Sequence, residues 1–122
     1  MPTVLIAEDN AVNRELLREL LEARGYTVDE AGDGLEALEK MAQSKPDALL
    51  LDLNMPVLDG FATLEKIRQD QRLASLPVMA VTAFAMRGDR EKALQAGFDS
   101  YLSKPIQSSV LYEELARLLA RS

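Results

Sequence analysis

Acidic and polar side chains follow the ends of several short apolar segments of this chain. Glu8 and Asp9 come directly after the first such segment, and Asp52 comes after the third. Thr82 ends the fourth segment, and Lys104 follows the fifth. If these segments are strands of one open parallel sheet, their carboxyl ends lie at the edge where such sheets bind ligands. We therefore expect three carboxylates, a hydroxyl and an ammonium group to meet at one site.

Each of these residues alone has a simpler explanation, such as a turn, a helix cap or a solvated charge. Their convergence does not, because two like charges about 4 Å apart repel by roughly 4 kcal/mol at an effective dielectric constant near 20. A domain with about 5–15 kcal/mol of total stability needs a compensating charge for such a cluster. Oxygen ligands select Mg²⁺ or Mn²⁺ over zinc or copper. Asp9 and Asp52 are the expected direct ligands, and Glu8 is expected to act through a bound water.

A metal ion beside a carboxylate, an ammonium group and a hydroxyl favours phosphoryl transfer. The metal and Lys104 would withdraw charge from the phosphoryl oxygens, and Thr82 would donate a hydrogen bond to one of them. An aspartate can itself be the nucleophile and form an aspartyl phosphate. Asp52 is the expected phosphoacceptor, because it follows the segment that we expect at the centre of the sheet.

The elements that must position these residues alternate regularly along the chain. Three of the five predicted strands are continuously apolar, which is typical of strands covered on both faces of a parallel sheet. The predicted strands cover residues 3–7, 27–31, 48–51, 78–82 and 100–103. Helical periodicity predicts one helix between Asn10, its cap, and Gly25, and four more over about 35–43, 61–70, 87–96 and 109–120. This alternation predicts a doubly wound α/β domain with right-handed crossovers.

The helical patterns also predict which apolar side chains face the core. Those expected to point inward include Val12, Leu16, Leu17, Leu20 and Leu21 in the first helix, Leu35 in the second and Val110 in the last. Two Asp-Gly pairs, Asp33-Gly34 and Asp59-Gly60, are interpreted as turns in which glycine supplies a positive φ.

Composition excludes several classes of function. The 122 residues suit a single domain, over residues 1–122, and the absence of cysteine and histidine excludes disulfides, zinc sites and Ser-His or Cys-His catalysis. The net charge of −6 argues against direct binding of nucleic acid. No apolar run approaches the roughly 20 residues of a membrane span, and the start lacks a charged leader. We therefore expect a cytoplasmic protein that contacts no membrane.

Four motifs resemble those of the receiver domains of two-component response regulators, the CheY-like superfamily. They are Ala7-Glu8-Asp9-Asn10, Leu51-Asp52-Leu53-Asn54-Met55-Pro56 with Asp59-Gly60, Val81-Thr82-Ala83 and Ser103-Lys104-Pro105. All four occur in order, each after a predicted strand, and the resemblance covers nearly the whole chain. It implies a flavodoxin-like (βα)5 fold with a five-stranded parallel sheet in the order 2-1-3-4-5.

The resemblance also implies a role for each acidic residue. Asp52 corresponds to the phosphorylated aspartate of the family. Asp9 and Asp52 would bind Mg²⁺ together with the backbone carbonyl of Asn54, and Glu8 completes the acidic pair. The phosphoryl group would come from a phosphohistidine on a sensor histidine kinase or a histidine phosphotransfer protein, which suits a chain that has no histidine of its own. The chain is then a phosphoacceptor that assists its own phosphorylation and dephosphorylation, rather than an enzyme.

Further positions correspond to the switch of the family. Thr82 matches the switch hydroxyl, Lys104 matches the phosphate-binding lysine, and the Lys104-Pro105 peptide is expected to be cis. Tyr101 matches the switch aromatic, which turns inward when the threonine engages phosphate. Asn54 and Phe84 lie two residues beyond Asp52 and Thr82, where family members adjust the lifetime of the phosphoryl group.

The resemblance places partner contacts on two surfaces. The phosphodonor would dock at the rim of the site and on the first helix, at Asn10, Asn13, Leu16 and Pro105. An output protein, whose identity the sequence does not indicate, would use the surface near Tyr101.

Three alternatives remain open. A receiver module of a hybrid sensor kinase has similar motifs, although Met1 and an end soon after the last helix favour a stand-alone protein. A phosphatase of the haloacid dehalogenase type needs a second acid where Asn54 stands, and a cap for which the chain has little room. A flavodoxin-like cofactor binder needs a phosphate loop after the first strand, where Glu8 and Asp9 would instead repel phosphate.

Overall fold

Strands and helices alternate along the whole of the described chain. The structure is a computed structural model that describes residues 2–83 and 88–121. Its strands are β1 (Thr3–Ala7), β2 (Thr27–Ala31), β3 (Ala48–Asp52), β4 (Val78–Thr82) and β5 (Ser100–Ser103). Its helices are α1 (Ala11–Ala23), α2 (Gly34–Gln43), α3 (Gly60–Gln69), α4 (Asp89–Ala96) and α5 (Ser108–Arg121). The predicted elements agree with these to within one or two residues, and Arg87, the predicted start of the fourth helix, lies outside the described residues.

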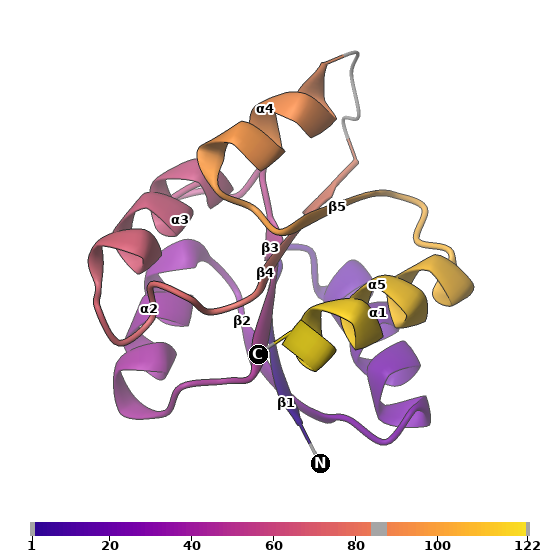
Figure 1. Cartoon of the computed structure of the whole chain (residues 1–122). Helices are drawn as coiled ribbons and strands as arrows, with labels where there is room; N and C mark the ends of the chain where they lie inside the picture. The colour runs from indigo at the N-terminus through magenta and orange to yellow at the C-terminus, as the bar shows by residue number, and fades with distance from the viewer. Residues whose placement is uncertain (1, 84–87, 122) are drawn as a thin grey trace.

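The five strands form one parallel sheet in the order β2-β1-β3-β4-β5. Figure 1 shows α1 and α5 on one face of the sheet and α2, α3 and α4 on the other. This arrangement confirms the predicted doubly wound fold. It also brings the carboxyl ends of β1, β3, β4 and β5 to one edge of the sheet.

The central strands carry the core on both of their faces. Every residue of β3 and β4 is buried. Leu49 and Leu51 pack in the cluster beneath α2, α3 and α4, whereas Leu50 packs with α1 and α5. This two-sided burial explains the continuous apolar runs in the sequence, and it leaves the ends of these strands closely packed.

Three of the predicted inward faces are wrong in part. Val12 is 75 % exposed and Leu35 is 49 % exposed, and Leu16 and Val110 are also exposed. In α1 the buried side chains are Leu17 and Leu21. At about 100° per residue, Val12 lies roughly 180° around the helix from Leu21, so one apolar stripe cannot bury both. The apolar side chains on the open side of α1 are left facing solvent.

The two Asp-Gly pairs begin helices rather than turns with a positive φ. Asp33 and Asp59 cap α2 and α3, and each side chain accepts a hydrogen bond from the backbone N–H three residues ahead. The interpretation of Gly34 and Gly60 through positive φ is therefore wrong, because φ is positive only at Gly25, Gly88 and Gly97 among the described glycines. Close packing requires Gly34 and Gly60 instead. A Cβ at Gly34 would lie 2.1 Å from Oγ1 of Thr63, and one at Gly60 would lie 2.7 Å from the carbonyl oxygen of Asp52.

Strand β2 forms one edge of the sheet and carries two adjacent acids. Nζ of Lys40 lies 3.2 Å from Oδ1 of Asp29, and Nη1 of Arg18 lies 2.6 Å from Oε2 of Glu30. Helices α1 and α2 therefore supply the counter-charges of this edge strand.

Arg68 of α3 joins the loops that precede β4 and β5. Its guanidinium donates to the carbonyl oxygens of Ala74, Leu76 and Gly97 and to the carboxylate of Asp99. The amino ends of these strands are thus tied together by one side chain.

Candidate functional site

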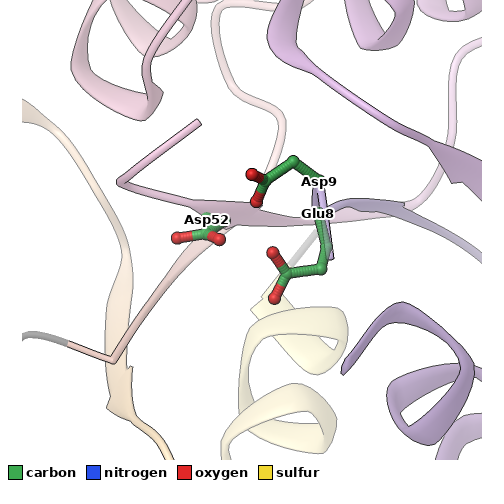
Figure 2. Close-up of side chains that lie close together, drawn as sticks. All are labelled: Glu8, Asp9 and Asp52. Carbon is green, nitrogen blue, oxygen red and sulfur yellow. The ribbon is translucent and has the colours of Figure 1, made fainter. Parts of the chain in front are cut away.

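Three carboxylates meet at the carboxyl edge of the sheet. Asp52 is the last residue of β3, and Glu8 and Asp9 follow β1, its neighbour in the sheet. One carboxylate oxygen from each of the three lies within 4.8 Å of the others. Figure 2 shows the three groups gathered between the ends of the two strands. Glu8 and Asp52 are buried, whereas Asp9 is exposed and reachable from solvent.

Lys104 reaches into this cluster from the loop after β5. Its ammonium group contacts Oε1 of Glu8 and lies 3.5 Å from Oδ2 of Asp52. Its backbone N–H donates to the carbonyl oxygen of Thr82, at 2.7 Å, and its peptide bond with Pro105 is cis. The end of β4 therefore fixes the backbone from which this lysine extends.

The cluster holds more negative charge than Lys104 balances. Burial, together with the neighbouring Asp52, raises the pKa of Glu8 to about 7, and the Lys104 ammonium opposes this rise. Three carboxylates within reach of one another form a set of hard oxygen donors suited to Mg²⁺ or Mn²⁺. The residues present therefore fit a divalent cation, which would supply the missing positive charge.

Asn54 links Asp52 to Thr82. Its backbone N–H donates to Oδ1 of Asp52 at 3.0 Å, and its side-chain Nδ2 lies 3.1 Å from Oγ1 of Thr82. Thr82 ends β4, beside β3, and is buried. Asn54 thus joins the predicted phosphoacceptor, through its backbone N–H, to the predicted switch hydroxyl of Thr82, through its side-chain amide.

The start of α3 packs closely against the backbone at Asp52 and Leu53. The N–H of Gly60 donates to the carbonyl oxygen of Leu53, and the start of α3 approaches the end of β3 so closely that no Cβ fits at Gly60. This role of Gly60, eight residues after Asp52, was not predicted from the sequence, although the Asp59-Gly60 pair was interpreted there as a turn. Arg14 was not predicted either; its guanidinium donates to the carbonyl oxygen of Glu8 at 2.8 Å.

Tyr101 of β5 lies in the core cluster beneath α2, α3 and α4. It is 9 % exposed, and its hydroxyl has no hydrogen-bond partner in the part of the chain that the structure describes. Burial also raises the pKa of this hydroxyl. The ring thus faces inward here. Phe84, the other aromatic predicted near the site, lies outside the described residues.

Comparison with known proteins identifies the family. The model of the response regulator receiver domain matches residues 4–116. The chain belongs to this family. The polar-differentiation response regulator DivK of Brucella anthropi is 43 % identical over 104 residues, which are 85 % of each chain.

Solved structures of receiver domains superpose closely on this one. The receiver domain of the sensor histidine kinase PA1611 from Pseudomonas aeruginosa, solved with magnesium in its active-site cleft, is 37 % identical with a TM-score of 0.90, and 98 % of each chain is covered. The chemotaxis protein CheY4 of Vibrio cholerae is 29 % identical with a TM-score of 0.89, and the match covers 97 % of this chain and 98 % of that one. These findings confirm the resemblance and the fold inferred from the sequence.

The receiver domain has a small hollow beside its acidic cluster. A cavity of about 120 Å³ is lined by residues of α1 and of the loop after β5, among them Asn13, Leu16, Lys104 and Pro105. Three of the four predicted docking residues therefore share one rim. The fourth, Asn10, caps α1, and its side chain accepts from the N–H of Asn13.

Within residues 2–83 and 88–121, no helix has the length and apolar character required to cross a bilayer.

Proposed function

We propose that this receiver domain accepts a phosphoryl group on Asp52 from a phosphohistidine of a sensor histidine kinase or a histidine phosphotransfer protein. A carboxylate oxygen of Asp52 attacks the phosphorus atom, the P–N bond breaks, and the histidine nitrogen leaves with the electron pair. The observation that carries this proposal is the set of partners around Asp52. The backbone N–H of Asn54 donates to one carboxylate oxygen, the Lys104 ammonium faces the other, and Glu8 and Asp9 lie alongside.

Mg²⁺ would be held by Asp9, Asp52 and the backbone carbonyl of Asn54, with Glu8 acting through a bound water. When bound, the ion would neutralise charge that develops on the phosphoryl oxygens. Lys104 supplies a second positive charge, since it already faces Asp52.

Thr82 would carry the signal from the phosphorylated site to the surface. A phosphoryl group on Asp52 would draw the hydroxyl of Thr82 toward it, in competition with the side-chain amide of Asn54, which contacts the Thr82 hydroxyl now. The movement would favour the inward position of Tyr101 and change the surface that an output protein reads. The output partner is a protein, and the net charge of −6 argues against direct contact with nucleic acid.

Asn54 and Phe84 would set the lifetime of the aspartyl phosphate. Our hypothesis is that Phe84 hinders the water that attacks in line with the phosphoryl group. Phe84→Ala should then speed the loss of phosphate, and an unchanged or slower loss would contradict this role.

Two arrangements of the chain are compatible with this chemistry. We propose a single receiver domain over residues 1–122 that acts in the cytoplasm as a separate protein, as the similarity to DivK suggests. The similarity to the receiver of a sensor kinase favours a second candidate, a receiver module within a hybrid kinase. The reading frame around the coding sequence distinguishes the two.

Intact-protein mass spectrometry tests the central proposal. The protein is incubated with acetyl phosphate or phosphoramidate, with Mg²⁺ or with EDTA. We expect a gain of one phosphoryl mass that requires Mg²⁺ and is lost in Asp52→Asn. Asp47→Asn is the matched control, because Asp47 binds the backbone N–H of Thr3 away from the site and should leave the gain unchanged. A phosphoryl gain that persists in Asp52→Asn would overturn the assignment.

A further inference from the structure

Arg14 lies one turn into α1 and contacts the loop that carries the two acids. Its Nη1 donates to the backbone carbonyl oxygen of Glu8 at 2.8 Å, and its Nε lies 3.6 Å from Oε1 of Glu30 on β2. The side chain is only 25 % exposed. The guanidinium therefore makes two contacts, one with Glu30 on the edge strand β2 and one with the peptide group between Glu8 and Asp9.

The backbone of Glu8 is held from its other side as well. Its N–H donates to the carbonyl oxygen of Ala31, the last residue of β2, at 3.0 Å. Because Arg14 binds the carbonyl oxygen, the backbone N–H and the backbone C=O of Glu8 both have protein partners. The plane of the peptide that joins Glu8 to Asp9 is then set, and with it the directions in which the two acidic side chains leave the chain.

Glu30 keeps Arg14 in place. Its carboxylate binds Arg14 through one oxygen and Nη1 of Arg18 through the other, at 2.6 Å. A guanidinium that is already held by one carboxylate loses little additional freedom when it donates to the carbonyl of Glu8. The contact is thus built into the fold rather than made by a free surface side chain.

Arg18 supplies a natural comparison. It also links α1 to Glu30, and it binds Glu22 at 3.2 Å, but neither of these contacts is to the acidic loop. If Arg14 served only to fasten α1 to β2, Arg18 would perform the same task. The additional contact of Arg14 with Glu8 is what separates the two arginines.

We propose that Arg14 is a positioning residue for the acidic pair: by binding the carbonyl oxygen of Glu8, it holds Glu8 and Asp9 in the geometry that binds Mg²⁺. This inference rests on the proposed function of the site. Partners that orient metal ligands commonly change metal affinity by about 10–100-fold when they are removed. Arg14 acts through the backbone rather than on a ligand atom, so we expect the lower end of that range.

The test compares Arg14→Met with Arg18→Met. Each variant removes one arginine that binds Glu30 and keeps most of the aliphatic stem. Mg²⁺ is titrated into the metal-free proteins, and the amide signals of Leu53 and Asn54 are followed by NMR. We expect Mg²⁺ to bind about tenfold more weakly to Arg14→Met and to bind Arg18→Met within twofold of the wild type. In the metal-free protein, the Asp9 amide of Arg14→Met should also exchange its hydrogen several-fold faster.

Phosphorylation by phosphoramidate gives an independent readout. The half-saturating Mg²⁺ concentration should rise about tenfold in Arg14→Met, whereas the rate at saturating Mg²⁺ should return to within about twofold of the wild type. If Arg14 had only a structural role, the phosphorylation rate would fall equally in both arginine variants, and the half-saturating Mg²⁺ concentration would not change.

The outcomes separate this inference from the proposed function. Mg²⁺ affinity in Arg14→Met that equals or exceeds the wild-type value overturns the inference, and so does an equal loss in Arg18→Met. If Arg14→Met does not fold, Glu30→Gln replaces it. We expect a loss of Mg²⁺ affinity there that is smaller than about tenfold, because Glu30 acts only through Arg14, and unchanged affinity also overturns the inference. A wild-type protein that neither binds Mg²⁺ nor gains a phosphoryl group would instead refute the proposed function.

Discussion

Replacing Gly60 with alanine should destabilise the domain and disturb Asp52 together. The new Cβ would lie 2.7 Å from the carbonyl oxygen of Asp52 and 2.8 Å from Cα of Leu53, whereas ordinary contacts begin at 3.4 Å. The two segments must therefore separate by 3.4 − 2.7 = 0.7 Å. Both neighbouring atoms belong to the backbone at the end of a fully buried strand, so neither can rotate away. Overpacking of this kind costs about 1–3 kcal/mol.

Urea unfolding measures this cost. With a slope of about 1–3 kcal/mol per molar urea, the midpoint should fall by roughly 1 M. Gly32→Ala is the matched control, because the nearest atom to its Cβ is Oε1 at the flexible end of Glu36, at 3.4 Å. We expect a change of less than about 1 kcal/mol there. If Gly60→Ala is as stable as Gly32→Ala and takes up phosphate at the wild-type rate, the close approach of α3 to Asp52 is not rigid and the reasoning fails.

Three more predictions concern other parts of the fold, and urea unfolding tests each of them. Val57 has a φ of 69°, which is strained for a β-branched residue and better suited to asparagine, and its side chain is 77 % exposed. Val57→Asn should therefore stabilise the domain by about 1 kcal/mol. A lower urea midpoint in this variant would contradict the inferred strain. Arg68→Met should lower the free energy of unfolding by about 2–3 kcal/mol, because several carbonyl oxygens lose a charged donor. Arg117→Met is the control, because it breaks an exposed ion pair and should cost less than about 1 kcal/mol. Equal losses of stability in the two variants would contradict the role given to Arg68. Hydrogen bonds from Arg117 and Ser100 lower the pKa of Glu114, so its contribution to stability is full above its unfolded pKa and is lost as pH falls through the lower folded value. The difference in stability between wild type and Glu114→Gln should therefore shrink on acidification below about pH 4.5, and a difference that stays constant or grows would show that the carboxylate is not stabilised.

The sequence predicted those features that depend on local pattern. The apolar run of β3 and the acid after it placed Asp52 at the carboxyl edge, because a strand buried on both faces must lie inside a parallel sheet. The exposed side of α1 was not predictable from its apolar stripe, since the sheet covers only the side that bears Leu17 and Leu21. Periodicity shows which residues share a face, but not how wide a face the neighbouring layer covers.

Contacts between segments that are distant in the chain could not be predicted from the sequence either. Gly60 has an ordinary turn signature in the sequence, and only the approach of α3 to β3 shows that a side chain cannot fit there. Arg14 carries no motif, because its role comes from a guanidinium that reaches a backbone oxygen six residues earlier and a carboxylate on another strand. Such roles depend on the three-dimensional arrangement rather than on residue type.

The acids of β2 have a consequence for the behaviour of the domain in concentrated solution. An edge strand exposes unpaired backbone groups to which a second chain can add a strand, and charged side chains on the edge oppose such addition. Asp29 and Glu30 lie in this strand, with Lys40 and Arg18 paired to them. A second copy that added its own β2 there would bring its acids close to Asp29 and Glu30. The edge therefore protects the domain against strand-mediated aggregation.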